Sequence, residues 1–271
     1  MTPPADEGGD LTPARLQRLL RSPQFGHRVF YYPSIGSTND RALELLDGGE
    51  AEGAIVLAEE QTRGRGRRDR TWHSPARAGV YVSILLRPAL AGGQTPLLTL
   101  LAAVAVARAL REAGGVEARI KWPNDLVVGR RKIGGILAES RGHASPPREV
   151  VVGIGINGNQ VPEEFPPEVR PQATSLRIET GRRCDRAAVL ASVLEEFERR
   201  YTRMLREGPA GTLREWEGLA VAPGGRVVVE GPSGRREGNV AGVDAEGALL
   251  LDTAAGRERI AFGEIVRTEW S

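Results

Sequence analysis

The chain has 271 residues, a formal net charge of +2 and 27% charged residues. This length is enough for one large and one small domain with a buried core. The small net charge excludes a molecule that attracts nucleic acid over its whole surface, so any basic function must come from local clustering. The single cysteine, Cys184, excludes an internal disulfide framework and fits a reducing cytoplasm, where we expect the protein to act.

The N-terminal ten residues are acidic and rich in Pro and Gly, and they lack the positive and apolar regions of a signal peptide. We expect these residues to be disordered. The longest apolar run, 97–107, is interrupted by Thr99 and is well short of the roughly 20 residues that span a bilayer. It predicts a buried core helix and no membrane association.

The first half of the chain predicts alternating helices and strands. Thr12 and Pro13, an N-cap residue followed by proline, open a short helix that ends near residue 21. Ser37 or Thr38 is expected to cap a second helix. Apolar segments predict strands at 29–32, 54–60 and 80–86 and a buried helix at 96–113.

The second half is richer in strands, which are expected at 118–122, 125–128, 132–140 and 149–157. A loop rich in Pro and Glu follows at 158–173, and Asp185 begins an amphipathic helix that ends near Leu205. Because short loops rather than regular helical crossovers join the strands, the pattern favours a mixed α+β sheet over a doubly wound one.

The pattern changes near Ala222, where a Pro-Gly-Gly sequence follows. Short alternating segments separated by Gly-containing turns then predict a small β-barrel or sandwich of about 50 residues. We therefore expect an N-terminal tail with a short helix at 1–27, a catalytic domain at 28–221 and a small C-terminal domain at 222–271.

The clearest chemical signal is the segment RGRGRRDR at residues 63–70. Glycines let backbone N–H groups approach an anion, and arginines hold phosphate or carboxylate oxygens in a bidentate fashion. A solvated basic loop or an RNA-binding tract would have the same composition. Its position between an apolar strand and Trp72 favours an anion site built on a scaffold.

A second signal is KWPND at 121–125, followed by KIGGIL at 132–137. Two lysines and an aspartate flank a hairpin-like unit, in which Asn124 and Asp125 are also ordinary turn residues. Gly134 and Gly135 inside an apolar strand indicate the close approach of another backbone or a ligand. Lys132 directly before them is well placed to reach that ligand.

Two other patterns are rejected. Gly153, Gly155 and Gly158 have the GxGxxG spacing of a dinucleotide site, but the Pro- and Glu-rich residues after them cannot open the helix that would bind a pyrophosphate. His27, His73 and His143 are scattered without metal-ligand or triad spacing. The chemistry must therefore depend on cations, backbone donors and an activated substrate.

Five segments together resemble the bacterial biotin–protein ligases. They are GSTND (36–40), EEQTRGRGRRDRTWHSP (59–75), KWPNDL (121–126), KIGGIL (132–137) and GIGIN (153–157). They occur in the order and spacing of that family, and GALLL (247–251) resembles its small SH3-like domain. The resemblance covers about residues 28–268. It implies an α+β fold with a mixed-sheet catalytic domain related to class II aminoacyl-tRNA synthetases, followed by a small SH3-like β-barrel.

The resemblance also implies roles for individual residues. Those expected to bind biotin are Ser37, Thr38, Asn39, Gln61, Arg65, Gly66, Arg67 and Lys132. Those expected at the nucleotide are Arg70, Trp72, Lys121, Asn124 and Asn157. Lys132, Arg65, Arg67 and Asp125 are expected to be catalytic. For Asp125 two roles stay open, positioning Mg²⁺ or positioning the incoming lysine.

The implied reaction is the activation of biotin by ATP with Mg²⁺, followed by transfer to a lysine of a biotin carboxyl carrier protein. Lysine and arginine would neutralise the charge where the biotin carboxylate meets the α-phosphate. The sequence leaves the oligomeric state open, with a homodimer as one alternative. Fewer than 30 residues precede VFYY (29–32), too few for a winged-helix domain, so we expect neither DNA binding nor repressor function.

The segment 63–70 departs from the family pattern at two positions. Asp69 replaces a usual glycine, and Arg63 replaces a small residue. We expect a stiffer loop or a loop that is self-paired through Asp69. Two alternative functions remain to be tested, a lipoate or octanoyl transferase and a nucleic-acid-binding module built on the arginines. The KWPND segment and the complete GRGRR sequence argue against the first, and Glu59, Glu60 and Asp69 interrupt the basic patch that the second requires.

Overall fold

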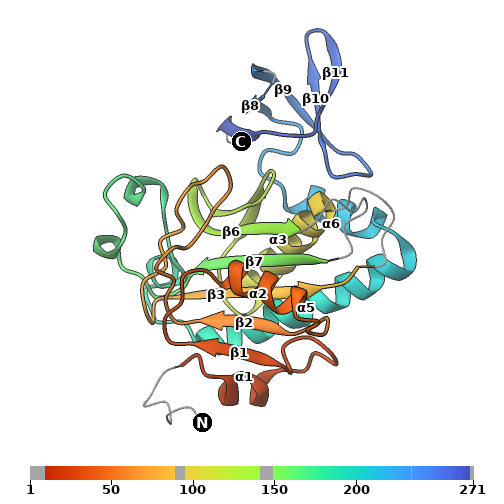
Figure 1. The fold of residues 1–271 in the computed structure, drawn as a ribbon. Helices are drawn as coiled ribbons and strands as arrows, with labels where there is room; N and C mark the ends of the chain where they lie inside the picture. Colours follow the sequence, from red (N-terminus) through yellow and green to blue (C-terminus); the bar gives the residue numbers. More distant parts are fainter. Residues whose placement is uncertain (1–9, 89–94, 141–148, 233, 269–271) are drawn as a thin grey trace.

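The computed structural model describes residues 10–88, 95–140, 149–232 and 234–268. The expected disorder of residues 1–10 and the position of His143 lie outside these ranges, except for Asp10, where the expectation is wrong because its carboxylate pairs with Arg186. Two separate sheets form the framework (Figure 1). The fold class is α+β, as the sequence predicts.

The larger sheet has seven strands in the order β1-β2-β3-β7-β6-β5-β4. Only β1 and β2 are parallel, and every other neighbouring pair is antiparallel. It is therefore the mixed sheet expected from the short connections. Its strands are β1 (Val29–Tyr32), β2 (Ile55–Ala58), β3 (Gly79–Leu86), β4 (Ala118–Lys121), β5 (Asp125–Val128), β6 (Arg131–Ser140) and β7 (Val150–Asn157).

Six α-helices lie among the described residues. They are α1 (Pro13–Leu19), α2 (Thr38–Asp47), α3 (Thr95–Glu112), α4 (Leu176–Thr180), α5 (Arg186–Glu207) and α6 (Ala210–Leu219). Two 3-10 turns, η1 (Pro162–Glu164) and η2 (Arg170–Gln172), lie in the segment expected to be a loop. None of the helices in the described ranges combines the length and hydropathy needed to cross a membrane.

Two helix starts confirm their predicted caps. The Thr12 hydroxyl accepts a hydrogen bond from the Arg15 N–H at 3.1 Å, and the Asp185 carboxylate accepts one from the Ala188 N–H at 3.2 Å. Helices α4 and α6 have no counterpart among the predicted elements. Gly211 and Gly218 weaken the apolar period of α6, and Pro209 precedes it, so packing rather than intrinsic propensity stabilises this helix.

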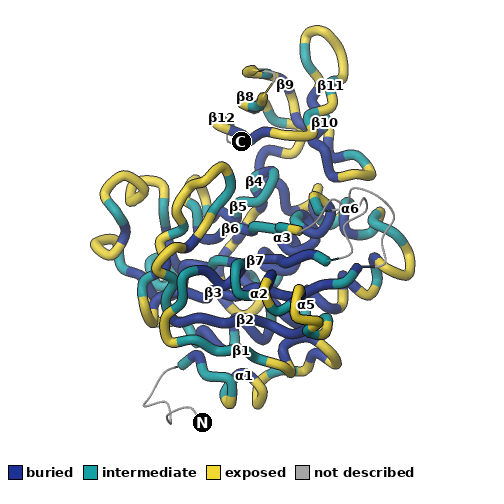
Figure 2. Tube along the Cα trace, in the orientation of Figure 1, coloured by how far each residue is buried: buried dark blue, intermediate teal, exposed yellow. Residues whose placement is uncertain are grey.

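The two faces of the large sheet are covered differently. Helix α3 packs against β4 to β7 and against α5 and α6, which explains why it is buried on almost every side. Helix α2 packs against β2, β3 and β7 on the opposite face, where Leu43 and Leu46 meet Val151 and Leu85. The central strands are buried, as Figure 2 shows in dark blue. Adjacent strand residues point to opposite faces, so alternate positions define the side covered by α3, called the helix-packed side, and a site side that carries α2.

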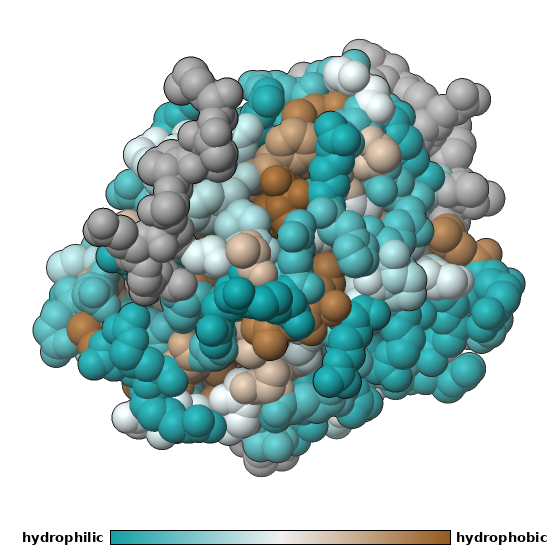
Figure 3. Space-filling view, turned by 90° about the horizontal axis from the view of Figure 1, so that it is seen from below, coloured by the Kyte–Doolittle hydropathy of each residue, from teal (hydrophilic) through white to brown (hydrophobic). Residues whose placement is uncertain are grey.

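The N-terminal residues pack into the same core. Leu11, Leu16 and Phe25 are at most 1% exposed and belong to the main apolar cluster. Arg186, which is 1% exposed, joins Asp10 to Glu59 through two ion pairs. Seen from the side of β1 and α1, the surface is mostly hydrophilic with apolar patches near its centre (Figure 3). This view agrees with the partial burial of every residue in the edge strand β1.

The C-terminal sheet has five antiparallel strands in the order β11-β10-β9-β8-β12. These strands are β8 (Arg226–Gly231), β9 (Gly234–Val243), β10 (Leu249–Thr253), β11 (Gly256–Ile260) and β12 (Glu264–Thr268). The Trp122 indole donates a hydrogen bond to the Gly247 carbonyl at 3.2 Å and so links the sheets. The small β unit expected after Ala222 is therefore present, close to the loop that carries the arginines (Figure 1).

Candidate active site

The arginine-rich loop folds back on itself. The Gly66 N–H bonds to the Arg70 carbonyl at 2.7 Å, and the Trp72 N–H bonds to the Gly64 carbonyl at 2.9 Å. A Cβ at Gly64 would collide with the Trp72 carbonyl, so this glycine is required by close packing and not for flexibility. The loop is therefore an ordered hairpin-like turn in this structure.

Asp69 has φ 57°, in the left-handed region that glycine adopts most easily. The departure from the family glycine is therefore tolerated by an aspartate, one of the non-glycine residues that enter this region. The Asp69 side chain is exposed, and none of the ion pairs between described residues includes it. The expectation that the loop pairs with itself through Asp69 is therefore wrong as far as the described residues are concerned.

The site side of the sheet is lined by glycines, where larger side chains would leave no room. A Cβ at Gly153 would collide with the Asn39 amide, and a Cβ at Gly155 would collide with the Trp72 indole. A Cβ at Gly135 would lie 3.4 Å from the same indole. These glycines let Trp72 and Asn39 pack closely against β6 and β7. The next α-helix after β7 is α4, which begins only at Leu176. The rejection of a dinucleotide fingerprint is thus supported by the fold.

One end of this surface carries a buried polar cluster. The Thr38 hydroxyl donates to Gln61 Oε1 at 2.9 Å, and the Ser83 hydroxyl lies 2.6 Å from Asn39 Oδ1. Gln61 Oε1 also accepts the Thr38 backbone N–H at 2.9 Å, so Gln61 satisfies the first turn of α2. Ser37 occupies the N-cap position of α2, but its side chain makes no capping hydrogen bond. Neither Ser37 nor Thr38 therefore caps the helix with its side chain, although the sequence predicts a cap from one of them. The cluster combines hydroxyl and amide groups within an apolar surround.

The other end is cationic. Lys132 Nζ lies 2.6 Å from Asp125 Oδ1 and 5.3 Å from the centroid of the Trp72 ring. The Asn157 amide donates to the Thr174 carbonyl at 2.9 Å and to the Lys132 carbonyl at 3.4 Å. Asn157 therefore contacts the backbone that carries Lys132.

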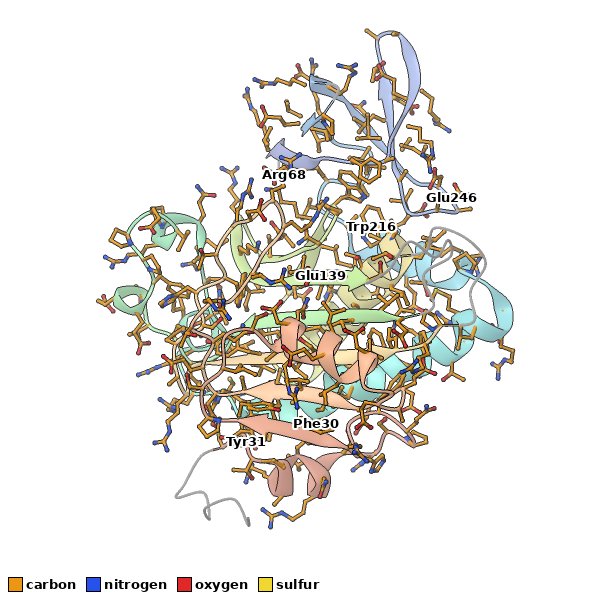
Figure 4. All side chains as sticks on the ribbon, viewed as in Figure 1. Phe30, Tyr31, Arg68, Glu139, Trp216 and Glu246 are labelled. Carbon is orange, nitrogen blue, oxygen red and sulfur yellow. The ribbon has the colours of Figure 1, made fainter. Side chains whose placement is uncertain are left out.

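The loop arginines bind acidic or carbonyl groups on four different elements. Arg65 Nη2 lies 2.8 Å from both Asp40 and Glu139. Arg67 donates to Asn124 Oδ1 and to the Gly263 carbonyl, each at 3.3 Å, and Arg70 lies 2.5 Å from Glu264. Figure 4 shows Glu139 over the middle of the large sheet and Arg68 at the C-terminal sheet. The loop thus joins α2, β6, the β4–β5 hairpin and the start of β12.

The ionisation of these groups follows from their neighbours. Burial lowers the pKa of Arg67, and the adjacent charge of Arg68 adds to the effect. The hydrogen bond to Glu264 raises the pKa of Arg70. Burial alone would raise the pKa of Glu264, but the hydrogen bond from Arg70 and the nearby positive charges, Lys121 included, lower it overall. At neutral pH the loop is therefore held by charged partners.

Glu139 and Glu264 are site residues that sequence reasoning missed. Glu139 follows Gly135 and Leu137 at alternate positions of β6, so the strand period could have placed it on the site side. Glu264 had no comparable signal, because its role depends on how the C-terminal sheet meets the loop.

A cleft of about 610 Å³ opens beside these groups. It is lined by residues 62–71 together with Leu137 and Glu139. Next to it, Trp72 Nε1 is a buried donor without a hydrogen-bond partner in the described ranges. Buried donors in native proteins nearly always have partners, so an acceptor from a ligand would satisfy this N–H. The structure brings most of the predicted site residues to one surface, where the Asn157 side chain is buried against the Lys132 and Thr174 carbonyls.

The fold and this surface define a class of protein, the biotin and lipoate ligases. The model of the biotin/lipoate A/B protein ligase family matches residues 31–157. The model of the biotin protein ligase C-terminal domain matches residues 224–267.

Individual relatives narrow the class. The bifunctional ligase/repressor BirA of Bacillus subtilis is 39% identical over 257 residues, which cover 95% of this chain and 79% of that protein. The biotin–[acetyl-CoA-carboxylase] ligase of Mycobacterium tuberculosis is 34% identical, with 94% and 97% covered. The Aquifex aeolicus biotin protein ligase solved with biotin and ATP has a TM-score of 0.78 at 30% identity, covering 90% of this chain and 100% of that one. This chain belongs to the biotin protein ligase family and is a biotin ligase.

Proposed function

We propose that the protein converts biotin and ATP to biotinyl-5'-AMP and then transfers biotin to a lysine of a biotin carboxyl carrier protein. The observation that carries this proposal is the combination of a polar cluster and a cationic end on one glycine-lined surface. A mostly apolar bicyclic ligand with one carboxylate matches that combination. The Aquifex relative that is solved with biotin and ATP supports the same pair of substrates.

Biotin would lie along the glycine-lined surface. Its ureido ring would meet the hydroxyl and amide groups of Thr38, Asn39 and Gln61, whose hydrogen bonds already form a buried network. Its carboxylate would point to Arg65, Gly66, Arg67 and Lys132, where the positive charges gather. Ser37 lies beside this network and is 3% exposed.

In the first step an oxygen of the carboxylate attacks the α-phosphorus of ATP, and the bond to pyrophosphate breaks. Two anions must meet for this step, so fixed cations lower its barrier most where charge develops. Lys132 is the best placed, because its ammonium lies beside Trp72 and is free to leave Asp125 for a stronger anion. In the second step the carrier lysine attacks the carbonyl carbon, and AMP leaves.

We propose nucleotide contacts for Arg70, Trp72, Lys121 and Asn124. Trp72 supplies the unpartnered buried donor next to the cleft, and Asn124 holds Arg67. Asn157 would act indirectly, since it binds the carbonyl of Lys132. In the described ranges no cluster of three acidic, histidine or cysteine side chains could hold a metal by itself.

Mg²⁺ fits this site only as a complex with ATP. The ion prefers octahedral oxygen ligands and commonly uses one or two protein carboxylates together with phosphate oxygens. Asp125 offers one carboxylate at the cationic end, and it would bind the ion after Lys132 turns to the substrate. Mg²⁺ would neutralise charge on the departing pyrophosphate.

The decisive experiment is ATP–pyrophosphate exchange with biotin or lipoate as the acid. We expect exchange that depends on biotin and Mg²⁺. Equal or faster exchange with lipoate would overturn the biotin assignment. Labelling of a purified biotin carboxyl carrier protein, with its target lysine changed to arginine as the control, tests the transfer step.

The absence of repressor function, the cytoplasmic location and the oligomeric state stay predictions. A mobility-shift assay on a palindromic operator at increasing salt tests DNA binding, and a sequence-specific nanomolar complex would contradict our expectation. Sedimentation with and without biotin and ATP distinguishes a monomer from a homodimer.

A further inference from the structure

A second cleft lies between α3, α5 and α6, on the helix-packed side of the large sheet. It has a volume of about 530 Å³ and is lined by Arg108, Arg111, Arg203, Gly211, Arg214, Glu215, Gly218 and Leu219. We call it the arginine cleft. The lining residues of the arginine cleft and of the catalytic cleft do not overlap. Helix α3 packs on the sheet face opposite to α2, so the two clefts lie on opposite sides of the sheet.

The arginine cleft has an excess of positive charge. Four guanidinium groups face one carboxylate, that of Glu215. Glu215 is already bound by Arg203 and, at 2.6 Å, by Arg200 from outside the lining. Glu117 binds Arg111 at 3.2 Å but is itself 83% exposed. Among the described residues no ion pair includes Arg108 or Arg214.

Unsatisfied donors gather on the same helices. Arg108 Nε is buried and has no hydrogen-bond partner in the described part of the chain. The same holds for Thr212 Oγ1 and Trp216 Nε1, which belong to α6 residues that are 1% exposed. Figure 4 shows Trp216 near α3, below the C-terminal sheet. An unsatisfied buried polar group costs about 1–3 kcal/mol, so three of them on two adjacent helices require an explanation.

The helix dipole does not explain why the arginines gather in this cleft. Arginines in the last turn of α3 are favoured by the helix dipole, which accounts for Arg111. It does not account for Arg203 and Arg214, which come from other helices and line the same cleft. Guanidinium groups from three helices around one space are the arrangement that binds oxyanions in a bidentate fashion.

We propose that the arginine cleft binds a small polyanion that carries two or more oxyanion groups, either phosphates or carboxylates. The volume is in the range of small-molecule sites, and apart from Leu219 and two glycines the lining is charged, which excludes an apolar ligand. The site is separate from the catalytic cleft and does not depend on the biotin ligase reaction.

The bound polyanion would act on the strand that leads to the catalytic hairpin. Arg111 Nε donates to the Ala118 carbonyl at 2.9 Å, and Ala118 begins β4. The end of α6 joins the same strand, because the Val221 N–H bonds to the Ile120 carbonyl at 2.9 Å. Strand β4 ends at Lys121, next to the KWPND turn.

The test is a titration of the ¹⁵N-labelled full chain with pyrophosphate or citrate, followed by NMR. Arg108 Nε–H belongs to the lining and reports on the arginine cleft, the Trp216 indole reports on α6, whose neighbouring residues line it, and the Trp72 indole reports on the catalytic cleft. We expect the Arg108 and Trp216 signals to shift and saturate with at least one of the two anions. Tighter binding of pyrophosphate assigns a phosphate ligand, and tighter binding of citrate assigns a carboxylate.

Three variants sharpen this test. Arg108→Gln and Arg214→Gln should each weaken binding about tenfold or more, the size expected for one charged hydrogen bond. Arg214 is exposed, so its replacement does not endanger folding. The control is Arg206→Gln, on the same helix as Arg203 but outside the lining, paired with Glu207 at 2.7 Å. The proposal is wrong if only the Trp72 signal moves or if no shift saturates. It is also wrong if all three variants bind the anion equally, because the cleft then holds an adventitious ion only.

Discussion

The two halves of the active site are built in different ways. On the sheet half, Asn39 and Trp72 lie against glycines with no spare volume, and the polar groups are buried. On the loop half, the arginines are exposed or half-buried and are held by acids such as Glu139 and Glu264. The sheet half is therefore preformed, whereas the loop half holds charges that a stronger anion can take over. We therefore propose that the first half recognises biotin and that the second half covers and protects the adenylate.

The largest expected effect is on Lys132, where the two halves meet. Lys132→Ala should lower the single-turnover rate of adenylation by about 10²–10³, or about 2.7–4 kcal/mol, the scale of a transition-state charge contact. Stability should change little, because the Lys132–Asp125 pair is partly exposed. Rapid-quench kinetics and thermal unfolding measure the two quantities.

The control for Lys132 removes its partner. Lys132→Ala leaves the Asp125 carboxylate unpaired, so Lys132→Ala/Asp125→Asn should recover any lost stability but not the rate. A near-normal adenylation rate in either variant would remove Lys132 from the mechanism.

The next effect tests the close packing of the sheet half. Gly155→Ala places a Cβ into the Trp72 indole, and overpacking of this kind costs about 1–3 kcal/mol. We expect weaker biotin binding by calorimetry and a changed Trp72 fluorescence. The matched control is Gly218→Ala, whose Cβ meets open space within α6. Equal biotin affinity in both variants would show that the sheet half is not preformed.

The sequence predicts the sheet half better than the loop half, for a physical reason. Alternation within contiguous strands places Gly135, Gly153 and Gly155 on one face. Alternation alone would put Lys132 on the other face, and the register shift between β5 and β6 brings it to the site side. Residue patterns of this kind are local. The partner of Arg70 is 194 positions away in sequence, at Glu264, and no local pattern announces it.

The structure differs from the sequence prediction at two further places, the start of α2 and helix α6. Gln61, rather than Ser37 or Thr38, satisfies the start of α2, because the chain after β2 returns to that helix. The two glycines of α6 weaken its helical pattern, so the sequence does not predict this helix, which tertiary packing stabilises. The roles of individual site residues stay predictions until variants are measured.

A smaller effect tests the loop half at Arg67. This side chain joins the loop to Asn124 and to the Gly263 carbonyl. Arg67→Gly should still form biotinyl-AMP but release it faster, on the order of tenfold to hundredfold for the loss of charged hydrogen bonds. Bystander proteins would then become biotinylated, which a streptavidin blot of added albumin measures. Retention of the adenylate at the normal rate would contradict the role of the loop as a cover.

Glu264 should have a weaker effect, because it holds the loop without touching the substrate. Glu264→Gln removes the charge that Arg68 and Arg70 share, and partly exposed ion pairs contribute about 0.2–1 kcal/mol each. We expect faster trypsin cleavage at residues 63–70 in the free protein and equal protection with biotin and ATP. The control is Glu246→Gln, an exposed partner of Arg259 in the same domain. Equal cleavage of the two variants would place the anchoring of the loop elsewhere.

The smallest effect is expected at Asp69, and it separates loop conformation from loop charge. Asp69→Gly introduces the residue that adopts φ 57° most easily but adds conformational freedom to the loop. The two contributions oppose each other, so adenylation should change less than about threefold, within the few tenths of a kcal/mol expected for their difference. Hydrogen exchange of the backbone at residues 64–72 should become faster in the free protein and converge with the parent once biotin and ATP bind. Arg77→Gly is the matched control, since Arg77 also has a positive φ, 61°, but lies outside the loop. If the exchange of residues 64–72 responds equally to both changes, the extra motion is a general consequence of glycine, and the loop half is as preformed as the sheet half.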